Sequence, residues 1–289
     1  VVRDSLDAKS AFARIVVLGL VSIMLTTGCG GATPAPVANS APAEAAQVED
    51  AGAEPAEPEM IARALKPFTG DYDAILERRY LRVLLPYSRT FYFVDEHGRE
   101  RGAAHDSLVE FEKVLNEQLG DKARPIQVLR IPVRRDQLFE YLKQGRGDMA
   151  LGNLTITPER QELADFSAPI VTDVREVVVT SASEPPVATA QDLAGREVYV
   201  RKTSSYFTHL TKLSDELKAA GKSAIEIRTV DESLEDEDLL ELVNAGAFPI
   251  TVVDDHMAKL WLEVFTDAKL QPEAVVNTGG NIAWAIRKD

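Results

Sequence analysis

The sequence predicts an α/β fold divided into two lobes. From about residue 76 onward, short apolar runs typical of strands alternate with segments whose apolar residues have helical spacing. This alternation indicates a mostly parallel sheet covered by helices. The order strand, turn, helix, strand, helix, strand, helix occurs twice, once in each half of this region. Two such lobes joined by extended segments form a cleft, and ligands of open α/β sheets bind beyond the carboxyl ends of the strands.

In the first half, the run LRVLLP is a strand that ends at a proline. We expect the next helix to begin with Asp106 as its N-cap and to end at Gly120. Pro158 suits the first turn of a later helix. The expected strands span 81–86, 126–132 and 148–153, and the expected helices span 106–120, 135–145 and 158–164.

The second half begins with the apolar run REVVVTSA and closes with NIAWAIRK. The helix that begins near residue 236 carries acidic residues in its first turn, where the helix dipole favours them. The expected strands span 175–182, 196–202, 225–230, 249–254 and 281–288, and the expected helices span 204–221, 236–246 and 255–265.

The chain shows no pattern that would support catalysis. Its four histidines are scattered, and it has no dinucleotide-binding, phosphate-loop or nucleophile-elbow motif. The acidic run at 231–241 lacks the glycine and the ligand order of a calcium loop, so we interpret it as a solvated helix start. The net charge of −14 argues against a nucleic-acid partner. We therefore predict no catalytic residue, no metal site, no cofactor and no enzymatic activity in this chain.

The N-terminus resembles a bacterial lipoprotein signal. Residues 1–28 combine basic residues, the 11-residue apolar run IVVLGLVSIML and a small-residue cleavage site, LTTG, before Cys29. The run is shorter than the ~20 residues that span a bilayer. We expect Cys29 to carry lipid; the alternative is a plain N-terminal anchor with an incidental cysteine. Residues 29–75, rich in Ala, Pro and Glu, are predicted to be a disordered tether.

The stretch GDMALGNLTITPERQELADFS, at 147–167, carries the strongest functional signal. At the carboxyl end of its strand, Asn153 and Thr155 can face the cleft. Pro158 starts a helix whose free N–H groups favour an anion, and Arg160 near that turn adds a bidentate cation. These groups predict a receptor for a carboxylate. The alternative is that Arg160 pairs on the surface with Glu162 or Asp165.

The same stretch resembles family 3 of the bacterial extracellular solute-binding proteins. The shared features are Gly145 to Asp148, the polar positions Asn153 and Thr155, the segment Thr157 to Arg160, and Asp165 to Ser167 followed by Pro169. The resemblance implies the type II periplasmic-binding fold, with the ligand in an interlobe cleft and a hinge between the lobes. It places a solute-binding domain at 76–289, with the first lobe at about 76–173 plus 282–289 and the second at about 174–281.

The resemblance also implies roles for further residues. Ser204 and Ser205 would open a helix whose N–H groups face the ligand, or would simply cap that helix. One aspartate of VVDDH, either Asp254 or Asp255, would meet the ligand's amino group. Tyr92, or its neighbour Phe93, would cover the ligand, although an aromatic residue there suits the core equally well. With Asn153, Thr155 and Arg160, these form the predicted ligand-binding set.

The segments TFYFVDEHGRERG, LLELVNAGAFPITVVDDH and IAWAIRKD resemble the N-terminal regulatory module of membrane-bound lytic transglycosylase F. We expect a periplasmic, lipid-anchored binding domain of a Gram-negative bacterium, with the outer membrane favoured because Gly30 follows Cys29. Its expected ligand is an amino acid or a small peptide, including a cell-wall fragment. The partner is either an ABC permease or an attached transglycosylase domain, and we expect the sequence to be truncated at its C-terminus.

Overall fold

The structure, a computed structural model, describes residues 66–120 and 124–288. The predicted signal peptide, Cys29 and most of the predicted tether lie outside these residues. Every helix within the described ranges is too short or too polar to cross a bilayer.

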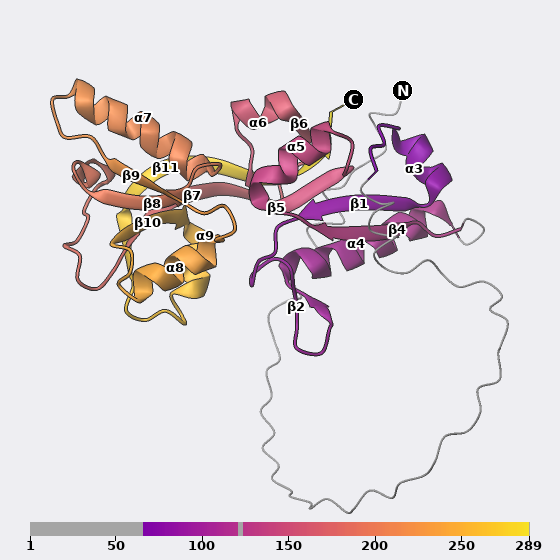
Figure 1. Ribbon diagram of the computed structural model, residues 1–289, viewed down its shortest axis with the longest axis horizontal. Coiled ribbons are helices and arrows are strands. Elements are labelled where there is room, and N and C mark those ends of the chain that lie inside the picture. Colours follow the sequence, from indigo (N-terminus) through magenta and orange to yellow (C-terminus); the bar gives the residue numbers. More distant parts are fainter. Residues whose placement is uncertain (1–65, 121–123, 289) are drawn as a thin grey trace, which may run out of the picture. The chain divides into compact units, whose positions relative to one another are not determined.

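Nine strands of the described residues form one mixed sheet in the order β4-β1-β5-β11-β7-β10-β8-β9, with β6 pairing β11 at the side (Figure 1). A separate small ribbon pairs β2 (Phe93–Val94) with β3 (Glu100–Arg101). The strands of the main sheet are β1 (Tyr80–Leu85), β4 (Gln127–Pro132), β5 (Met149–Thr155), β6 (Ala164–Phe166), β7 (Val171–Thr180), β8 (Glu197–Arg201), β9 (Glu226–Val230), β10 (Ile250–Asp254) and β11 (Lys269–Arg287).

The sheet is divided into two lobes by its two long strands. We call the part built on β4, β1 and β5 the first lobe, and the part built on β10, β8 and β9 the second lobe. Strands are parallel inside each lobe, as predicted, but β11 pairs antiparallel with β5 and β7, and β7 pairs antiparallel with β10. Figure 1 shows β7 and β11 running side by side from one lobe to the other. The predicted two-lobed α/β architecture is therefore confirmed.

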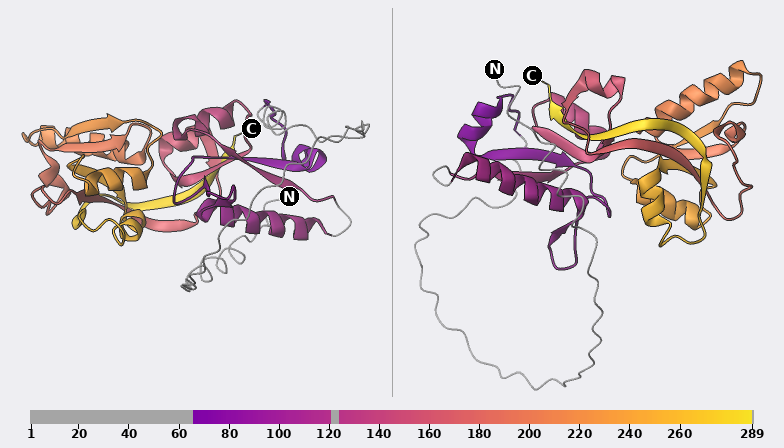
Figure 2. Two further views of the ribbon diagram at one scale, coloured as in Figure 1. Left: turned by 60° about the horizontal axis from the view of Figure 1, so that its bottom comes forward. Right: turned by 180° about the vertical axis from the view of Figure 1, so that it is seen from behind.

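Helices cover both faces of each lobe (Figure 2). In the second lobe, successive residues of β7 point to opposite faces, as strand geometry requires. Val178 packs with α7, whereas Val177 and Val179 pack with α8 and α9. The helices are α3 (Tyr72–Arg78), α4 (Ala103–Leu119), α5 (Leu138–Lys143), α6 (Pro158–Leu163), α7 (Ser205–Ala219), α8 (Asp236–Asn244) and α9 (Asp255–Trp261), with short 3₁₀ turns η1 (Arg135–Gln137) and η2 (Ala190–Leu193).

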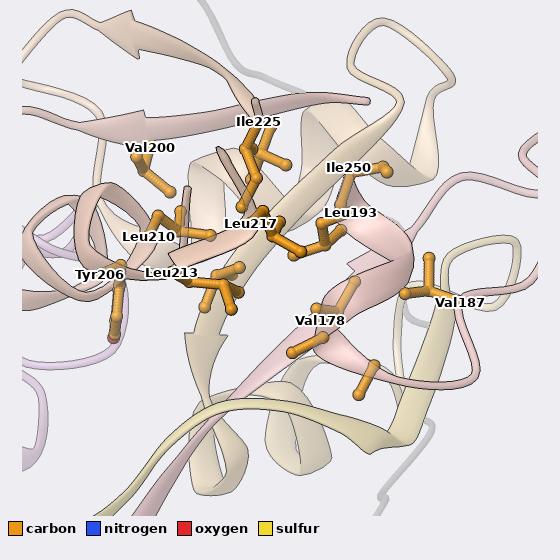
Figure 3. Packing of buried hydrophobic residues seen from close by; sticks show 14 residues of the cluster. Val178, Val187, Leu193, Val200, Tyr206, Leu210, Leu213, Leu217, Ile225 and Ile250 are labelled. Atoms are coloured by element: carbon orange, nitrogen blue, oxygen red, sulfur yellow. The ribbon is translucent and has the colours of Figure 1, made fainter. Parts of the chain in front are cut away.

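The apolar core beneath α7 fixes the position of that helix. Leu210, Leu213 and Leu217 recur at helical spacing and pack on Val178 and Val200 of the sheet (Figure 3). Burying a Leu or Val side chain contributes roughly 1.5–3 kcal/mol. The start of α7, which Ser204 caps, is therefore held firmly against the sheet.

Residues 66–70 belong to the fold, although we predicted a tether through residue 75. Buried Asp148 binds Arg78, Arg82 and Arg287. Two of these arginines also donate to backbone carbonyls at the entry of the chain: Arg82 Nη1 to Lys66 at 2.9 Å, and Arg287 Nη1 to Phe68 at 2.6 Å. Helix α3 follows at once, within and beyond the predicted tether. The composition of this stretch did not reveal these long-range contacts.

Two further expectations need correction. Helix α4 begins at Ala103 with Gly102 as its N-cap, so Asp106 lies inside the first turn and does not cap it. The last strand begins at Lys269 and not at 281, because shifts of register in β11 accommodate Pro272 and the pair Gly279–Gly280. Pro and Gly argue against a strand in a sequence, so the first part of β11 was not predicted.

Candidate functional site

The carboxyl end of β5 meets the start of α7 around a small polar cavity of about 10 Å³. This space is close to the size of one water molecule. Both lobes contribute side chains to its wall. The lining residues are Arg135, Asn153, Thr155 and Arg160 from the first lobe, and Arg201, Ser204, Ser205, Tyr206 and Asp236 from the second. Five of the eight residues predicted from the sequence are among them.

Asn153 reaches across to the second lobe. Its backbone has φ 57°, the left-handed conformation that Asn tolerates better than most residues. Its Nδ2 donates to Asp254 Oδ2 at 2.7 Å, and its Oδ1 accepts from His256 Nε2 at 3.1 Å. Burial lowers the pKa of His256, which keeps this ring neutral. Asn153 is thus oriented from both ends, with its amide nitrogen toward the aspartate.

Arg160 is a partly buried cation that has only carbonyl partners among the described residues. Thr157 caps α6 by accepting from the Arg160 backbone N–H, with Pro158 in the first turn. The guanidinium donates to the carbonyls of Thr155 at 2.9 Å and Thr203 at 3.0 Å. Burial, and then the positive charge of Arg135, lower its pKa to about 10. The alternative, a surface pair with Glu162 or Asp165, is not formed.

The two serines at the start of α7 have different contacts. Ser204 is the N-cap of the helix, accepting from the Phe207 N–H at 3.2 Å and donating to the Arg201 carbonyl at 2.7 Å. Ser205 donates across the lobes to Thr155 Oγ1 at 3.4 Å. Capping is therefore present, and both serines also line the cavity.

Asp254, at the end of β10, is 1 % exposed and lies behind Asn153 and Tyr206. Its backbone N–H donates to the Tyr206 hydroxyl at 3.1 Å. Its Oδ1 is buried without a hydrogen-bond partner among the described residues. Burial, followed by the charges of Asp236 and Glu176, raises the pKa of Asp254 to about 8. Of the two candidate aspartates, this is the one beside the cavity.

The structure places two predicted residues elsewhere. Asp255 begins α9, where its carboxylate contacts Lys259 Nζ at 2.8 Å and Arg175 Nε at 3.7 Å on the outside of the second lobe. Tyr92 is buried in the first lobe and its hydroxyl donates to Glu100 Oε1 at 2.5 Å. Tyr92 also forms the backbone bridge with Ser88 at the base of the hairpin. Neither residue lines the cavity, and the burial of Tyr92 agrees with the alternative that it is a core residue.

Two buried ion pairs in the site were not anticipated. Arg135 binds Glu235 from lobe to lobe, with Nε at 2.9 Å from Oε1, and Arg201 binds Asp236 at 2.5 Å within the second lobe. Burial alone would lower the pKa of Arg201, but Asp236 outweighs it and the pKa is raised. The interpretation of the acidic run 231–241 as a solvated helix start is therefore wrong for Glu235, Asp236 and Glu237, all of which are buried.

The charges around the cavity almost cancel in pairs. Arg135 is matched by Glu235, and Arg201 by Asp236. Within the described residues, Arg160 is left without a carboxylate and Asp254 without a cation. The site therefore holds one unmatched positive group and one unmatched carboxyl on opposite lobes. This arrangement complements a molecule that carries both a carboxylate and an ammonium group.

A second, open groove lies beyond the Arg135–Glu235 pair. It has a volume of about 350 Å³ and also runs between the lobes. Arg135 lines both spaces and thus forms part of the wall between them. The groove is lined by Pro86, Tyr87, Pro132, Val133, Arg134, Arg135, Gln137, Glu232, Ser233 and Glu235.

Two α/β lobes crossed by two antiparallel strands, with a polar site between them, define a binding protein of the type II periplasmic fold. The sequence pattern of the bacterial extracellular solute-binding proteins, family 3, matches residues 82–247. The chain belongs to this family. A solved ancestral arginine-binding protein with bound arginine shares the fold, with a TM-score of 0.58 and 24 % identity over 73 % of this chain and 85 % of that chain.

Curated relatives include two kinds of protein. The chain is 30 % identical to the membrane-bound lytic murein transglycosylase F of Desulfosudis oleivorans over 154 residues, which are 53 % of this chain and 32 % of that protein. It is 27 % identical to the L-cystine-binding protein TcyJ of Escherichia coli K12 over 124 residues, 43 % of this chain and 42 % of that protein. The match covers only 32–43 % of the length of the first four transglycosylase relatives.

Proposed function

We propose that the domain binds an amino acid or a small peptide through its α-ammonium and α-carboxylate groups, without catalysis. The unmatched pair of Arg160 and Asp254 carries this proposal. A partly buried cation and a buried carboxyl are each unfavourable without an opposite charge, and a zwitterionic ligand compensates both. Ser204, Ser205, Asn153 and Thr155 supply hydrogen-bonding groups around the same space. Amino-acid binding by the named relatives is consistent with this role.

Ligand entry requires the lobes to separate, since the cavity has room for about one water molecule. Two features of the crossing strands suit a hinge near residues 171–176 and 280–284. Asp173 in β7 has φ 56°, and the register of β11 against β7 shifts between Gly280 and Ile282. Irregular backbone at such positions absorbs the dihedral changes of domain closure.

The function is tested by isothermal titration calorimetry with the described domain and a panel of L-amino acids, L-cystine and alanine dipeptides. Arg160→Ala should weaken the binding of any ligand found by roughly 2–5 kcal/mol, because a buried charge pair is lost. Arg228→Ala is the matched control, since Arg228 is exposed and pairs with Glu197 and Glu226 on the outer strands of the second lobe, outside the site. Equal affinity in the wild type and Arg160→Ala would remove Arg160 from the site.

The open groove favours a ligand longer than one amino acid. Its volume of about 350 Å³ lies within the usual range of small-molecule sites, and Arg135 separates it from the inner cavity. Its wall combines the apolar surface of Pro86 and Val133 with the carboxylates of Glu232 and Glu235. A peptide, including a cell-wall fragment, could place its terminal residue in the cavity and its remainder in the groove. Dipeptides that bind tighter than their free amino acids would support this version.

We further propose that the protein works outside the cytoplasm, held to a membrane by lipid on Cys29. Family membership supports the extracytoplasmic location, and the lipoprotein-like N-terminus supports the anchor. The anchor is tested by incorporation of labelled palmitate, which Cys29→Ser should abolish.

Two uses of such a binding domain follow: delivery of ligand to an ABC permease, or regulation of an attached lytic transglycosylase domain. The relatives named transglycosylase F favour the second. The gene sequence beyond codon 289 distinguishes them, because the second requires a further catalytic domain.

A further inference from the structure

Glu176 of β7 lies directly opposite Asp254 of β10 in the antiparallel register. Residues opposite each other on neighbouring strands share one face of the sheet, with Cβ atoms roughly 4.5–5.5 Å apart. Both side chains are buried, with 2 % and 1 % exposed. Like charges in this arrangement repel each other, and burial strengthens the repulsion. The pair therefore calls for a cation or a proton between the two carboxyl groups.

Each of the two carboxyl groups has one oxygen fixed and one free. Asp254 Oδ2 accepts from Asn153, and Glu176 Oε2 accepts from His209 Nδ1 at 2.7 Å. Asp254 Oδ1 and Glu176 Oε1 are buried and have no hydrogen-bond partner within the described residues. A buried acceptor without a donor costs about 1–3 kcal/mol, and more if it is charged. Two such oxygens on one face of the sheet form a preformed acceptor for N–H groups.

The pair lies next to the polar cavity. His209, which holds Glu176, stands one helical turn after the cavity residue Ser205 on α7. Tyr206 of the same turn accepts from the backbone of Asp254 and also lines the cavity. The two carboxyl groups are thus held between the sheet and the first turns of α7, beside residues that line the cavity.

We propose that Glu176 and Asp254 together bind a primary ammonium group of the ligand, with His209 as the positioning residue of Glu176. The free oxygen of each carboxylate accepts one N–H of the ammonium. This inference rests on the proposed function and deepens it, because it selects ligands with a free primary amine. Acylated amines, which carry no charge and a single N–H, cannot satisfy both oxygens.

The test compares amino acids with their Nα-acetyl derivatives. Dissociation constants of L-arginine, L-glutamine and L-cystine, and of each acetylated form, are measured by calorimetry for the wild type and Glu176→Gln. The isosteric amide can keep its bond to His209, so folding should survive. We expect the free amino acid to bind roughly 10- to 100-fold more weakly to Glu176→Gln, the worth of a charge-assisted hydrogen bond, with little change for the acetylated form. Glu226→Gln, on exposed β9, is the matched control.

The outcomes distinguish a failure of the ammonium role of Glu176 from a failure of the proposed function. If free amino acids bind the wild type, and Glu176→Gln prefers them over the acetylated forms by the same ratio, the ammonium role of Glu176 is overturned. The proposed function is then unaffected. Weakening of both forms by the same factor shows a structural role and also overturns it. If no amino acid or dipeptide of the panel binds the wild type, the proposed function and this inference fail together. If Glu176→Gln does not fold, the ratio of free to acetylated affinity is measured instead for Glu176→Asp, whose carboxylate is retracted by one methylene.

Discussion

Asp254 is the residue whose protonation decides when the site can hold an ammonium group. Its pKa of about 8, raised by burial and by Asp236 and Glu176, means that the free protein carries a proton there at neutral pH. An ammonium ligand needs the ionised carboxylate, so binding must expel that proton. The affinity for a free amino acid should therefore rise about tenfold per pH unit well below pH 8 and level off above it.

This dependence is measured by calorimetry between pH 6 and pH 9, in buffers of different ionisation enthalpy that reveal the released proton. Asp254→Asn should abolish the dependence together with most of the affinity. Asp255→Asn, whose carboxylate is held outside the site by Lys259, should keep both. An affinity that stays constant across this pH range would contradict the assigned role of Asp254.

The same residue makes a prediction for stability without ligand. The folded-state pKa of about 8 exceeds the ordinary value of 3.8, so the native state binds the proton more tightly than the unfolded state. This contribution to stability is complete below pH 3.8 and is lost as the pH rises through 8. Relative to the wild type, Asp254→Asn should gain stability between pH 5 and pH 8 in thermal unfolding. A stability difference that does not vary with pH would exclude this linkage.

Among the elements, α4 shows how a single glycine sets a boundary. Gly102 has φ 110°, and a Cβ at this position would stand 2.4 Å from the carbonyl oxygen of Phe91. Gly120, at the other end of α4, has φ 76° but open space around it. Both substitutions by alanine incur the strain of a left-handed backbone, and only Gly102→Ala adds a clash with the main chain. We expect Gly102→Ala to lower the free energy of unfolding by about 1–3 kcal/mol more than Gly120→Ala.

Chemical denaturation of the two variants gives this difference. Equal losses would mean that the hairpin carrying Phe91 moves aside without cost. A larger loss for Gly120→Ala would contradict the description of the α4 boundaries.

The sequence predicted most elements because their periodicity is local. The strand at β1, the helix α7 with its serine cap, and the turn of Thr157 and Pro158 into α6 all depend on neighbouring residues. Arg160 and Asn153 could be placed for the same reason. What escaped prediction depends on long-range contacts: Glu235 was assigned to solvent because its partner Arg135 is 100 residues away. For Tyr92 the choice between cleft and core stayed open, because nothing local shows that its hydroxyl meets Glu100 inside the hairpin.

In the whole molecule, the lobes contact each other through several polar groups of different burial. Arg135–Glu235 is buried, and Ser88 donates to Glu237 at 2.7 Å, also in a buried setting. The Arg89–Glu241 pair is exposed. Removing one partner of a buried pair leaves an uncompensated charge, whereas exposed pairs contribute ~0–1 kcal/mol. Closure of the lobes should therefore depend strongly on Glu235 and weakly on Glu241.

Small-angle X-ray scattering of the ligand-free domain tests this. Glu235→Gln should increase the radius of gyration, because the uncompensated charge of Arg135 favours an open cleft that hydrates it. Glu241→Gln, which also removes an interlobe carboxylate, should leave the radius unchanged. The same radius for both variants would show that Arg135–Glu235 does not hold the lobes together.

The charge cluster at Asp148 has a mechanical consequence. It joins the carbonyls of Lys66, Phe68 and Gly70 to β1 through Arg82, to β11 through Arg287, and to Asp148, the residue before β5. A pull applied at residue 66 would spread over several charge-assisted bonds loaded in parallel, all of them in the first lobe. Tension along the preceding chain would therefore act on the first lobe and not on the hinge segments of β7 and β11. The second lobe would remain free to move relative to the first.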